Sequence, residues 1–333
     1  MAQYTHLSAP DPELPTFPRH TGPIPKDYIP ILRQTIASNV TLDATRIPPE
    51  SAHTVENRTI AVRGGEIAIR TISPTPLPEE GSVFPVLVWF HGGGWVAGNL
   101  EMDDVNLRIL SVELRLSIVN VDYRLAPEHP FPTGLDDCYT AIKWTAENCK
   151  SIRGSLDKGF LIGGISAGAN FAAAAVHRAL KDPFFQKHKI TGHVLQIPAV
   201  VHPAAYPAEY TTELLSYNQN ANAPIVSKAA IEFFYGCLNG PPTNPELSPL
   251  LADHVGLPPL YIQICGLDPL RDEGLLYERV LREQDVRTKL DIYPGVPHGF
   301  HALWPGMTAS KKWEEDVRAG VRWILALAQT PAV

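Results

Sequence analysis

Cysteine is scarce in this sequence, and it lacks both a long apolar run and an excess of basic side chains. The four cysteines are scattered through 333 residues without the spacing of a metal-binding motif. Cys138 and Cys149 fall on one predicted helix, too far apart to form a disulfide. We therefore expect these two, together with Cys237 and Cys265, to be reduced packing residues, and we expect neither a metal ion nor a cofactor.

The charge balance and the chain start exclude several other classes. No apolar run approaches the roughly 18–20 residues that a membrane-spanning helix needs. The first residues, Met1–His6, carry neither the positive charge nor the apolar stretch of a secretory signal. The 28 Lys and Arg side chains are outnumbered by 35 Asp and Glu, which leaves no basic footprint for nucleic acid. We expect a cytoplasmic protein that neither binds nucleic acid nor inserts stably into a membrane.

Proline is plentiful, and strand-like segments alternate regularly with helix-like ones. Many of the 32 prolines crowd the first 50 residues and residues 198–258, which indicates irregular covering segments. Helical stretches such as Leu135–Glu147 and Ala167–Leu180 lie between most of the apolar strand-like runs. Those runs occur at residues 85–90, 117–121, 159–163, 193–197, 259–264 and 288–293. The alternation predicts an α/β fold with a mostly parallel central sheet and helices on both faces.

Three further segments extend this architecture. Short alternating runs at Thr59–Arg63 and Glu66–Ile72 flank Gly64-Gly65, which predicts a hairpin. A helix is expected at Tyr28–Ala37. An apolar stripe along Lys311–Ala328 predicts a closing amphipathic helix.

A candidate nucleophile lies between one predicted strand and one predicted helix. The pentapeptide Gly164-Ile165-Ser166-Ala167-Gly168 follows an apolar run and precedes an alanine-rich helix. A serine at the apex of such a strand–turn–helix takes strained backbone angles, so it needs small residues two before and two after it. The alternative is a glycine-rich turn in which Ser166 only caps the helix. The strand–turn–helix context favours the nucleophile.

A second glycine-rich turn, His91-Gly92-Gly93-Gly94-Trp95, follows the predicted strand at residues 85–90. Three successive glycines have no side chains to bury, but they let backbone N–H groups face a ligand. Two such groups and the N–H after the serine would form an oxyanion hole for acyl transfer. A tight turn beside a buried histidine is the alternative.

A serine nucleophile needs a base, and the base needs an orienting acid. In strand–turn–helix serine enzymes the acid and then the base follow the serine along the chain. Asp268 and His298 each lie just beyond a predicted strand end, in that order. Asp272 is an alternative acid, although Asp272 and Glu273 look more like the first turn of a helix. The histidines without such a placement, including His129, His177, His193 and His254, are expected at the surface or around the site.

Together these motifs resemble the hormone-sensitive-lipase-like branch of the α/β-hydrolases. The matching segments run in family order from about residue 85 to about residue 300. They are His91–Trp95, Asp122–Pro132, Gly164–Gly168, Ser248–Leu251, Asp268–Glu273 and Pro297–Phe300.

The resemblance implies a role for each matched position. Ser166 corresponds to the nucleophile, His298 to the base and Asp268 to its orienter. Gly93, Gly94 and Ala167 correspond to the oxyanion donors, and His91 to a residue that fixes the turn. Asp122, Arg124 and Glu128 would form a partly buried network of ion pairs, unless they are simply exposed loop charges. Ile165 departs from the family pattern, which commonly has Asp or Thr before the nucleophile.

A break in the alternation predicts a cap. Residues 203–247 contain a polar stretch and then a helix around Lys228–Leu238. We expect residues 1–50 and 203–247 to pack together over the serine, with residues 51–202 and 248–333 forming the core. Candidate substrate-binding residues on the pocket wall are Trp95, Tyr217, Phe233 and Phe234, and the phenylalanines could equally belong to the interior of the cap.

The sequence thus predicts a serine carboxylesterase that hydrolyses small or medium-chain esters through an acyl-enzyme. A lipase, an amidase or a deacetylase of one metabolite would use the same residues. A non-catalytic receptor on this fold is a further alternative, which the presence of His298 disfavours. The family resemblance also suggests a homodimer.

Overall fold

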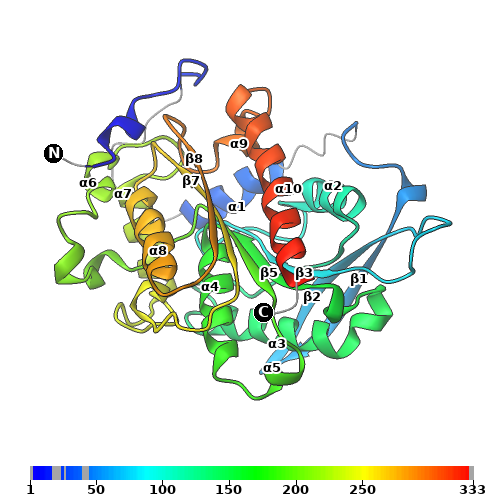
Figure 1. Ribbon diagram of the computed structural model, residues 1–333. Coiled ribbons are helices and arrows are strands. Elements are labelled where there is room, and N and C mark those ends of the chain that lie inside the picture. Colours follow the sequence, from blue (N-terminus) through cyan, green and yellow to red (C-terminus); the bar gives the residue numbers. More distant parts are fainter. Residues whose placement is uncertain (1–2, 17–23, 26–27, 40–44, 330–333) are drawn as a thin grey trace.

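The computed structural model describes residues 3–16, 24–25, 28–39 and 45–329, and the central element of the fold is one eight-stranded sheet (Figure 1). Its strand order is β1-β2-β4-β3-β5-β6-β7-β8. The first two strands join antiparallel, and β4, β3, β5, β6, β7 and β8 run parallel to one another. The strands are β1 (His53–Val62), β2 (Gly65–Pro74), β3 (Val86–Phe90), β4 (Ser117–Asp122), β5 (Phe160–Ile165), β6 (Gly192–Gln196), β7 (Leu260–Cys265) and β8 (Thr288–Tyr293).

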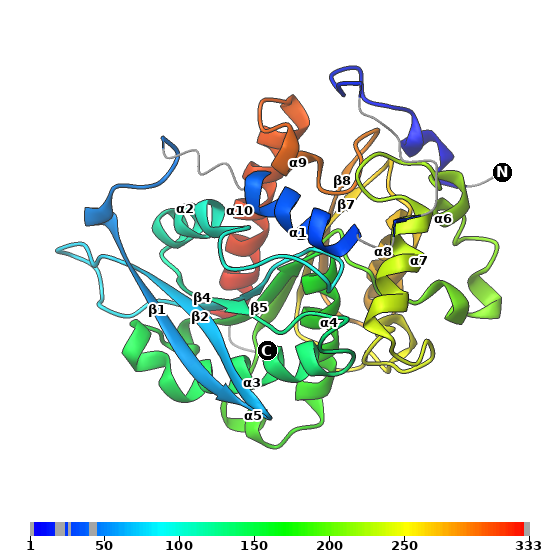
Figure 2. The ribbon, with the colours of Figure 1, turned by 180° about the vertical axis from the view of Figure 1, so that it is seen from behind.

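Helices cover both faces of this sheet, as the alternation of segments predicts. Helices α3, α4 and α8 pack on one face, whereas α2 and α10 pack on the other (Figures 1 and 2). Each face of the sheet has its own apolar core, because successive side chains along a strand point to opposite faces. The helices are α1 (Tyr28–Asn39), α2 (Asp104–Leu114), α3 (Thr133–Asn148), α4 (Ala167–Leu180), α5 (Phe184–Lys187), α6 (Ser216–Gln219), α7 (Lys228–Leu238), α8 (Arg271–Glu283), α9 (Phe300–Leu303) and α10 (Thr308–Ala328).

The predicted elements are confirmed, with longer strands in the hairpin. β1 and β2 pair over ten residues each, from His53 opposite Pro74 to Val62 opposite Gly65. The hydrogen-bonded pairing of the two strands thus continues beyond the alternating apolar and polar residues from which the hairpin was predicted. Parts of the predicted N-terminal cap, at residues 1–2, 17–23, 26–27 and 40–44, lie outside the described residues.

The surface position, one of the two places expected for the remaining histidines, is wrong for three of them. His177, His193 and His254 are buried rather than at the surface, whereas His129 is exposed as expected. The rings of His177 and His254 pack against the ring of Tyr277, so aromatic packing at the amino-terminal end of β6 encloses them.

The cysteines differ from the prediction in one respect. Cys149 lies in a 3₁₀ turn just after α3, not on the same helix as Cys138. All four cysteines are free. Cys138 and Cys265 are buried, whereas Cys149 and Cys237 are only half-buried.

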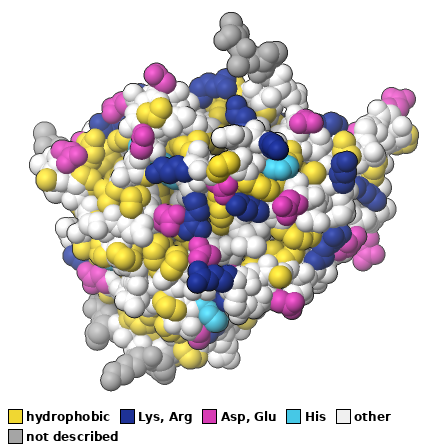
Figure 3. Space-filling view, turned by 90° about the horizontal axis from the view of Figure 1, so that it is seen from below, with side chains coloured by type: hydrophobic (Ala, Val, Ile, Leu, Met, Phe, Trp, Pro, Cys, Tyr) yellow, Lys and Arg dark blue, Asp and Glu magenta, His cyan; other side chains and the backbone are white. Residues whose placement is uncertain are grey.

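The surface carries charges of both signs. Figure 3 shows Lys and Arg side chains lying among Asp and Glu side chains over one whole face of the molecule. None of the described helices combines the length and the apolar character needed to cross a bilayer.

Candidate active site

Ser166 lies at a sharp turn between β5, which ends at Ile165, and α4, which begins at Ala167. Its φ of 55° and ψ of −117° are strained for a residue with a side chain. A Cβ atom added to Gly164 would lie 2.6 Å from the carbonyl carbon of Gly168, and one added to Gly168 would overlap the carbonyl oxygen of Phe90. Only glycine fits at these two positions, and this local packing holds the serine hydroxyl away from the sheet.

A line of hydrogen bonds joins three side chains from different strand ends. Nε2 of His298 lies 2.8 Å from Oγ of Ser166, and Nδ1 of His298 lies 2.7 Å from Oδ2 of Asp268. Asp268 is 1% exposed and His298 is 5% exposed. The second carboxylate oxygen of Asp268 accepts the N–H of Leu270. The carboxylate therefore fixes the histidine with its proton on Nδ1, which leaves Nε2 free to accept the serine proton.

Asp272, the alternative acid, faces another way. Its Oδ1 accepts from Arg271, and its Oδ2 accepts the backbone N–H groups of Leu215 and Ser216. It lies in the first turn of α8, as the sequence indicates. The geometry thus brings Asp268, and not Asp272, to His298.

The turn at residues 91–95 lies beside the serine. A Cβ atom added to Gly92 would lie 3.5 Å from Cβ of Ser166. Gly93 and Gly94 have φ values of 111° and 61°, and the next residue, Trp95, also has a positive φ of 63°. The N–H groups of Gly93, Gly94 and Ala167 donate to no other described residue. These three donors are available to an oxygen atom bound next to Ser166.

His91 holds the base of this turn. Its Nδ1 lies 2.7 Å from the carbonyl oxygen of Gly92, and its own carbonyl accepts the hydroxyl of Tyr123. Its ring also stacks on that of Tyr123 at 4.3 Å. Complete burial lowers the pKa of His91 to about 4, so the ring is neutral near pH 7. The neutral ring braces the turn, as the resemblance implies.

The three charged residues predicted to form a network in the Asp122–Pro132 segment pair instead with residues outside it, and Glu128 is exposed. Arg124 pairs with Asp137 at 2.7 Å, and Glu128 pairs with Arg33 of α1 at 2.8 Å. Asp122 lies 3.9 Å from Nε2 of His91, and burial raises the pKa of its carboxyl group to about 6. None of the three predicted residues pairs with another of the three among the described contacts.

A set of polar residues that the sequence reasoning missed anchors the Asp268 loop. Asn220 donates to the carbonyl oxygen of Asp268 at 3.0 Å, and Ser216 donates to that of Pro269 at 2.7 Å. The guanidinium of Arg271, fully buried, donates to the carbonyl of Gly266 and to Ser8. The polar run at residues 216–222 was a signal that could have indicated such anchoring.

The N-terminal segment packs on the loop before His298. Gly295 exchanges hydrogen bonds with this segment, because its N–H donates to Leu7 and its carbonyl accepts from Asp11. A Cβ atom on Gly295, whose φ is 72°, would lie 2.5 Å from the backbone nitrogen of Asp11. The segment thus braces the loops that carry Asp268 and His298.

The candidate pocket residues lie at different places. Trp95 and Tyr217 are buried, and the hydroxyl of Tyr217 donates to Glu232 at 3.1 Å. Phe233 is half-buried and lines an outer groove of α7, where its ring meets Tyr28 at 5.6 Å. Phe234, by contrast, covers the glycine turn, because a Cβ atom on Gly94 would lie 2.6 Å from its ring.

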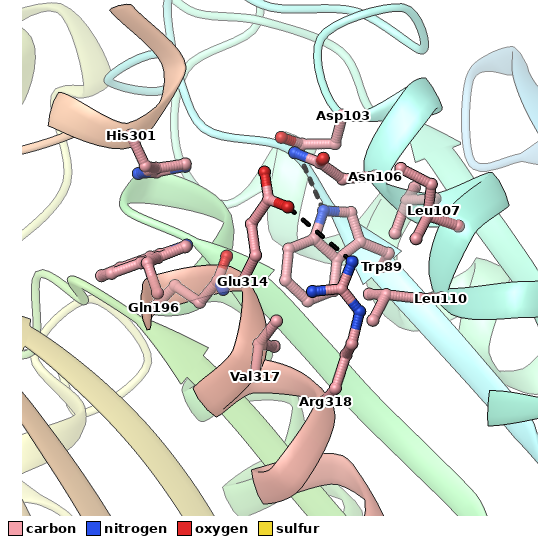
Figure 4. Close-up of a pocket in the computed structure, with 12 residues that line it drawn as sticks. Trp89, Asp103, Asn106, Leu107, Leu110, Gln196, His301, Glu314, Val317 and Arg318 are labelled. Atoms are coloured by element: carbon pink, nitrogen blue, oxygen red, sulfur yellow. Dashed lines mark hydrogen bonds and ion pairs between the residues drawn. The ribbon is translucent and has the colours of Figure 1, made fainter. Parts of the chain in front are cut away.

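A separate cavity of about 40 Å³ lies between β3, α2 and α10, on the opposite face of the sheet from α4 (Figure 4). Trp89 forms one wall and donates to Asp103, and Glu314 and Arg318 face each other nearby. None of Ser166, Asp268 and His298 lines it. Within the described residues, no group of three or more His, Cys, Asp or Glu is arranged to hold a metal ion.

Comparison with known proteins agrees with this architecture. A model of the α/β-hydrolase fold matches residues 87–302. The crystal structure of vibralactone cyclase superposes with a TM-score of 0.92 at 38% identity, covering 98% of this chain and 97% of that one. Versiconal hemiacetal acetate esterase of Dothistroma septosporum is 36% identical over 75% of this chain and 76% of its own. Carboxylesterase NlhH of Mycobacterium tuberculosis is 33% identical over 74% and 75% of the two chains.

Proposed function

The chain belongs to the α/β-hydrolase family, and from this membership we propose that it is a serine carboxylesterase for small or medium-chain esters. The hydrogen-bonded line from Asp268 through His298 to Ser166 is the observation that carries the proposal. The names of the esterase relatives support the same reaction class.

The first half of the reaction acylates the enzyme. Nε2 of His298 takes the proton of Ser166 while Oγ attacks the ester carbonyl carbon. The carbonyl oxygen becomes an oxyanion, which the N–H groups of Gly93, Gly94 and Ala167 stabilise. The tetrahedral intermediate collapses, the bond to the alcohol oxygen breaks, and His298 gives its proton to the leaving alcohol.

The second half releases the acid. Water loses a proton to Nε2 of His298 and attacks the acyl carbon, and the bond to Oγ of Ser166 then breaks. The proton returns from His298 to the serine. Throughout, Asp268 holds the Nδ1–H tautomer and stabilises the imidazolium charge.

Covalent labelling tests the nucleophile. A fluorophosphonate probe is expected to add once to the wild type, and mass spectrometry of the digested protein is expected to find it on Ser166. Ser166→Ala is expected to remain folded, unlabelled and inactive toward p-nitrophenyl butanoate. Normal ester turnover by Ser166→Ala contradicts the proposal.

A matched pair of variants tests the acid. Asp268→Asn is expected to lower kcat by roughly 10⁴, because the histidine would then adopt the wrong tautomer. Asp272→Asn removes a carboxylate from the same segment but touches backbone N–H groups rather than His298. It is expected to retain far more activity than Asp268→Asn, and the reverse order would make Asp272 the acid.

The acyl-enzyme offers a second candidate outcome, namely ring closure. The likeness to a vibralactone cyclase over 98% of this chain favours testing it. A hydroxyl group carried by the acyl chain could replace water as the attacking group, and the product would be a lactone instead of an acid. Turnover of a hydroxyacyl ester in ¹⁸O-labelled water separates the two outcomes. Hydrolysis places one ¹⁸O in the acid, whereas ring closure yields an unlabelled lactone.

Substrate panels separate the remaining alternatives. A series of p-nitrophenyl esters of rising chain length is expected to show a short or medium optimum. An optimum at long chains with activation by a lipid interface would indicate a lipase. Faster cleavage of anilides than of matched esters would indicate an amidase or a deacetylase.

A further inference from the structure

Two buried polar atoms next to the glycine turn have no hydrogen-bond partner among the described residues. They are Nε1 of Trp95 and the hydroxyl oxygen of Tyr235. The two side chains are 3% and 4% exposed, and their ring centroids lie 4.8 Å apart. An unpartnered buried polar group costs free energy, so such groups usually pair with water or with a ligand.

The pair lies close to the reacting serine. Trp95 directly follows Gly94, a candidate oxyanion donor, and Gly92 of the same turn lies beside Ser166, since a Cβ atom added to Gly92 would lie 3.5 Å from Cβ of Ser166. Tyr235 directly follows Phe234, whose ring covers Gly94. The end of the glycine turn, at Trp95, and helix α7, at Tyr235, therefore meet at this pair.

Other tyrosines of the same region are satisfied. The hydroxyl of Tyr217 donates to Glu232 at 3.1 Å, and that of Tyr206 lies 3.5 Å from Glu273. Tyr235 differs from both of them, since its hydroxyl is more deeply buried and lacks a partner among the described residues. The missing partner is thus particular to the position beside Trp95.

The chemistry of the two groups defines what they can bind. The indole N–H of Trp95 can only donate a hydrogen bond. Burial raises the pKa of Tyr235 well above its usual value, so the hydroxyl keeps its proton and can donate as well. A partner for both therefore has to offer an acceptor, most simply one oxygen atom.

The surroundings favour an uncharged oxygen. The ring of His202 lies tilted against that of Tyr235, with centroids 4.4 Å apart, and burial lowers the pKa of His202, so it is neutral near pH 7. Its Nδ1 accepts the N–H of Ala204, which places the proton on Nε2. Burial raises the pKa of Glu273 well above its usual value, and this carboxyl group carries no positive charge in either protonation state. No positive charge in this group of residues would balance an anion.

We propose that Trp95 and Tyr235 form a specificity subsite that binds a second, uncharged oxygen atom of the ester substrate, such as a ketone, ether or hydroxyl oxygen. The inference rests on the proposed function, because it assigns the subsite to the substrate of Ser166. It narrows the substrate class from simple alkyl esters to oxygenated ones.

Matched esters test this subsite. The acyl series compares p-nitrophenyl pentanoate with the 3-oxo and 4-oxopentanoates and with 3-methoxypropanoate. The alcohol series compares butyl butanoate with 2-methoxyethyl butanoate. For each matched pair, kcat/KM of the oxygenated ester is divided by kcat/KM of the alkyl ester. This ratio is then divided by the ratio of the rates at which hydroxide hydrolyses the same two esters without enzyme, which corrects for their intrinsic reactivity. The wild type is expected to favour at least one oxygenated ester by roughly tenfold.

Tyr235→Phe removes only the unpartnered hydroxyl and is expected to return that ratio close to one. It is also expected to melt no lower than the wild type, because the lost hydroxyl has no partner among the described residues. Tyr206→Phe is the control, since it removes a nearby hydroxyl that lies against Glu273, and it is expected to keep the wild-type ratio.

The outcomes separate the two proposals. Turnover of alkyl esters with no preference for oxygen at any position overturns the subsite alone. A preference that Tyr235→Phe leaves unchanged does the same. Failure of every ester to react, with no labelling of Ser166, overturns the proposed function and the subsite with it.

Discussion

The buried His177 makes a defined contribution to stability that depends on pH. Its Nδ1 lies 3.1 Å from the carbonyl oxygen of Asp253, and its Nε2 lies 3.2 Å from the hydroxyl of Tyr277 and 3.4 Å from Nδ1 of His254. Burial and then the neighbouring His254 lower the pKa of His177 to about 3. We predict that His177→Gln removes a loss of stability that the wild type suffers between pH 7 and pH 5.

The size of the effect follows from proton linkage. In the unfolded chain the imidazole has a pKa of about 6.5, so it takes up a proton as the pH falls below that value. In the folded protein it stays neutral down to about pH 3. The stability that the neutral ring contributes is therefore complete above about pH 6.5 and is lost as the pH falls toward 3. Between pH 7 and pH 5 the loss is roughly 2 kcal/mol for this single group.

Urea unfolding of both proteins at pH 7, 6 and 5 measures this difference. At pH 7 the variant is expected to be less stable by about 1–2 kcal/mol, because it loses hydrogen bonds of the ring. At pH 5 the difference in stability is expected to close or reverse, since only the wild type has lost the stability that the neutral His177 ring contributes at pH 7. Titratable groups that do not interact with His177 cancel in the comparison.

The control and the refuting result are equally direct. His129 is exposed, so His129→Gln is expected to give a stability curve parallel to that of the wild type from pH 7 to pH 5. If the curve of His177→Gln is also parallel to that of the wild type, the ring of His177 titrates alike in both states, and the reasoning from its burial fails.

Three substitutions test the geometry around the serine. Gly94→Ala is expected to lower kcat/KM for esters at least 100-fold, because the strained positive φ and the contact with Phe234 would displace a candidate oxyanion donor. Adding Phe234→Ala to this variant is expected to restore part of the rate. Gly295→Ala is expected to lower the free energy of unfolding by about 1–3 kcal/mol in urea titrations, because its Cβ would overlap the N-terminal segment. Asn220→Ala is expected to lower kcat about tenfold with little change in KM, because the Asp268 loop loses an anchor.

The sequence predicts local elements well where a pattern lies within one segment. α4 and α7 begin and end at the residues that the periodicity indicates. The glycines at 164 and 168 predict the turn at Ser166, because the need for small residues there is steric and local. The strand ends that carry Asp268 and His298 follow from the α/β alternation, whereas the catalytic roles of these side chains stay predictions.

Contacts between distant segments could not be predicted in the same way. The sequence shows Asn220 only as part of a polar stretch and Arg271 only as part of the segment Asp268–Glu273, and the fold brings both to the carbonyls of the Asp268 loop. Phe233 and Phe234 are indistinguishable in sequence, and the rotation of α7 decides that Phe234 covers Gly94. The burial of the three histidines could not be predicted either, because no local sequence pattern distinguishes a buried imidazole from an exposed one.

Ile165 shows how the structure resolves a departure from the family pattern. Its side chain is 7% exposed and joins the apolar core between the sheet and α10, so a carboxylate there would lose its hydration. The adjoining turn is instead held from other directions. The hydroxyl of Tyr123 donates to the carbonyl of His91, and Arg33 of α1 donates to the carbonyl of Val96. An apolar residue before Ser166 is therefore compatible with a fixed glycine turn, because hydrogen bonds from the loop after β4 and from α1 restrain it.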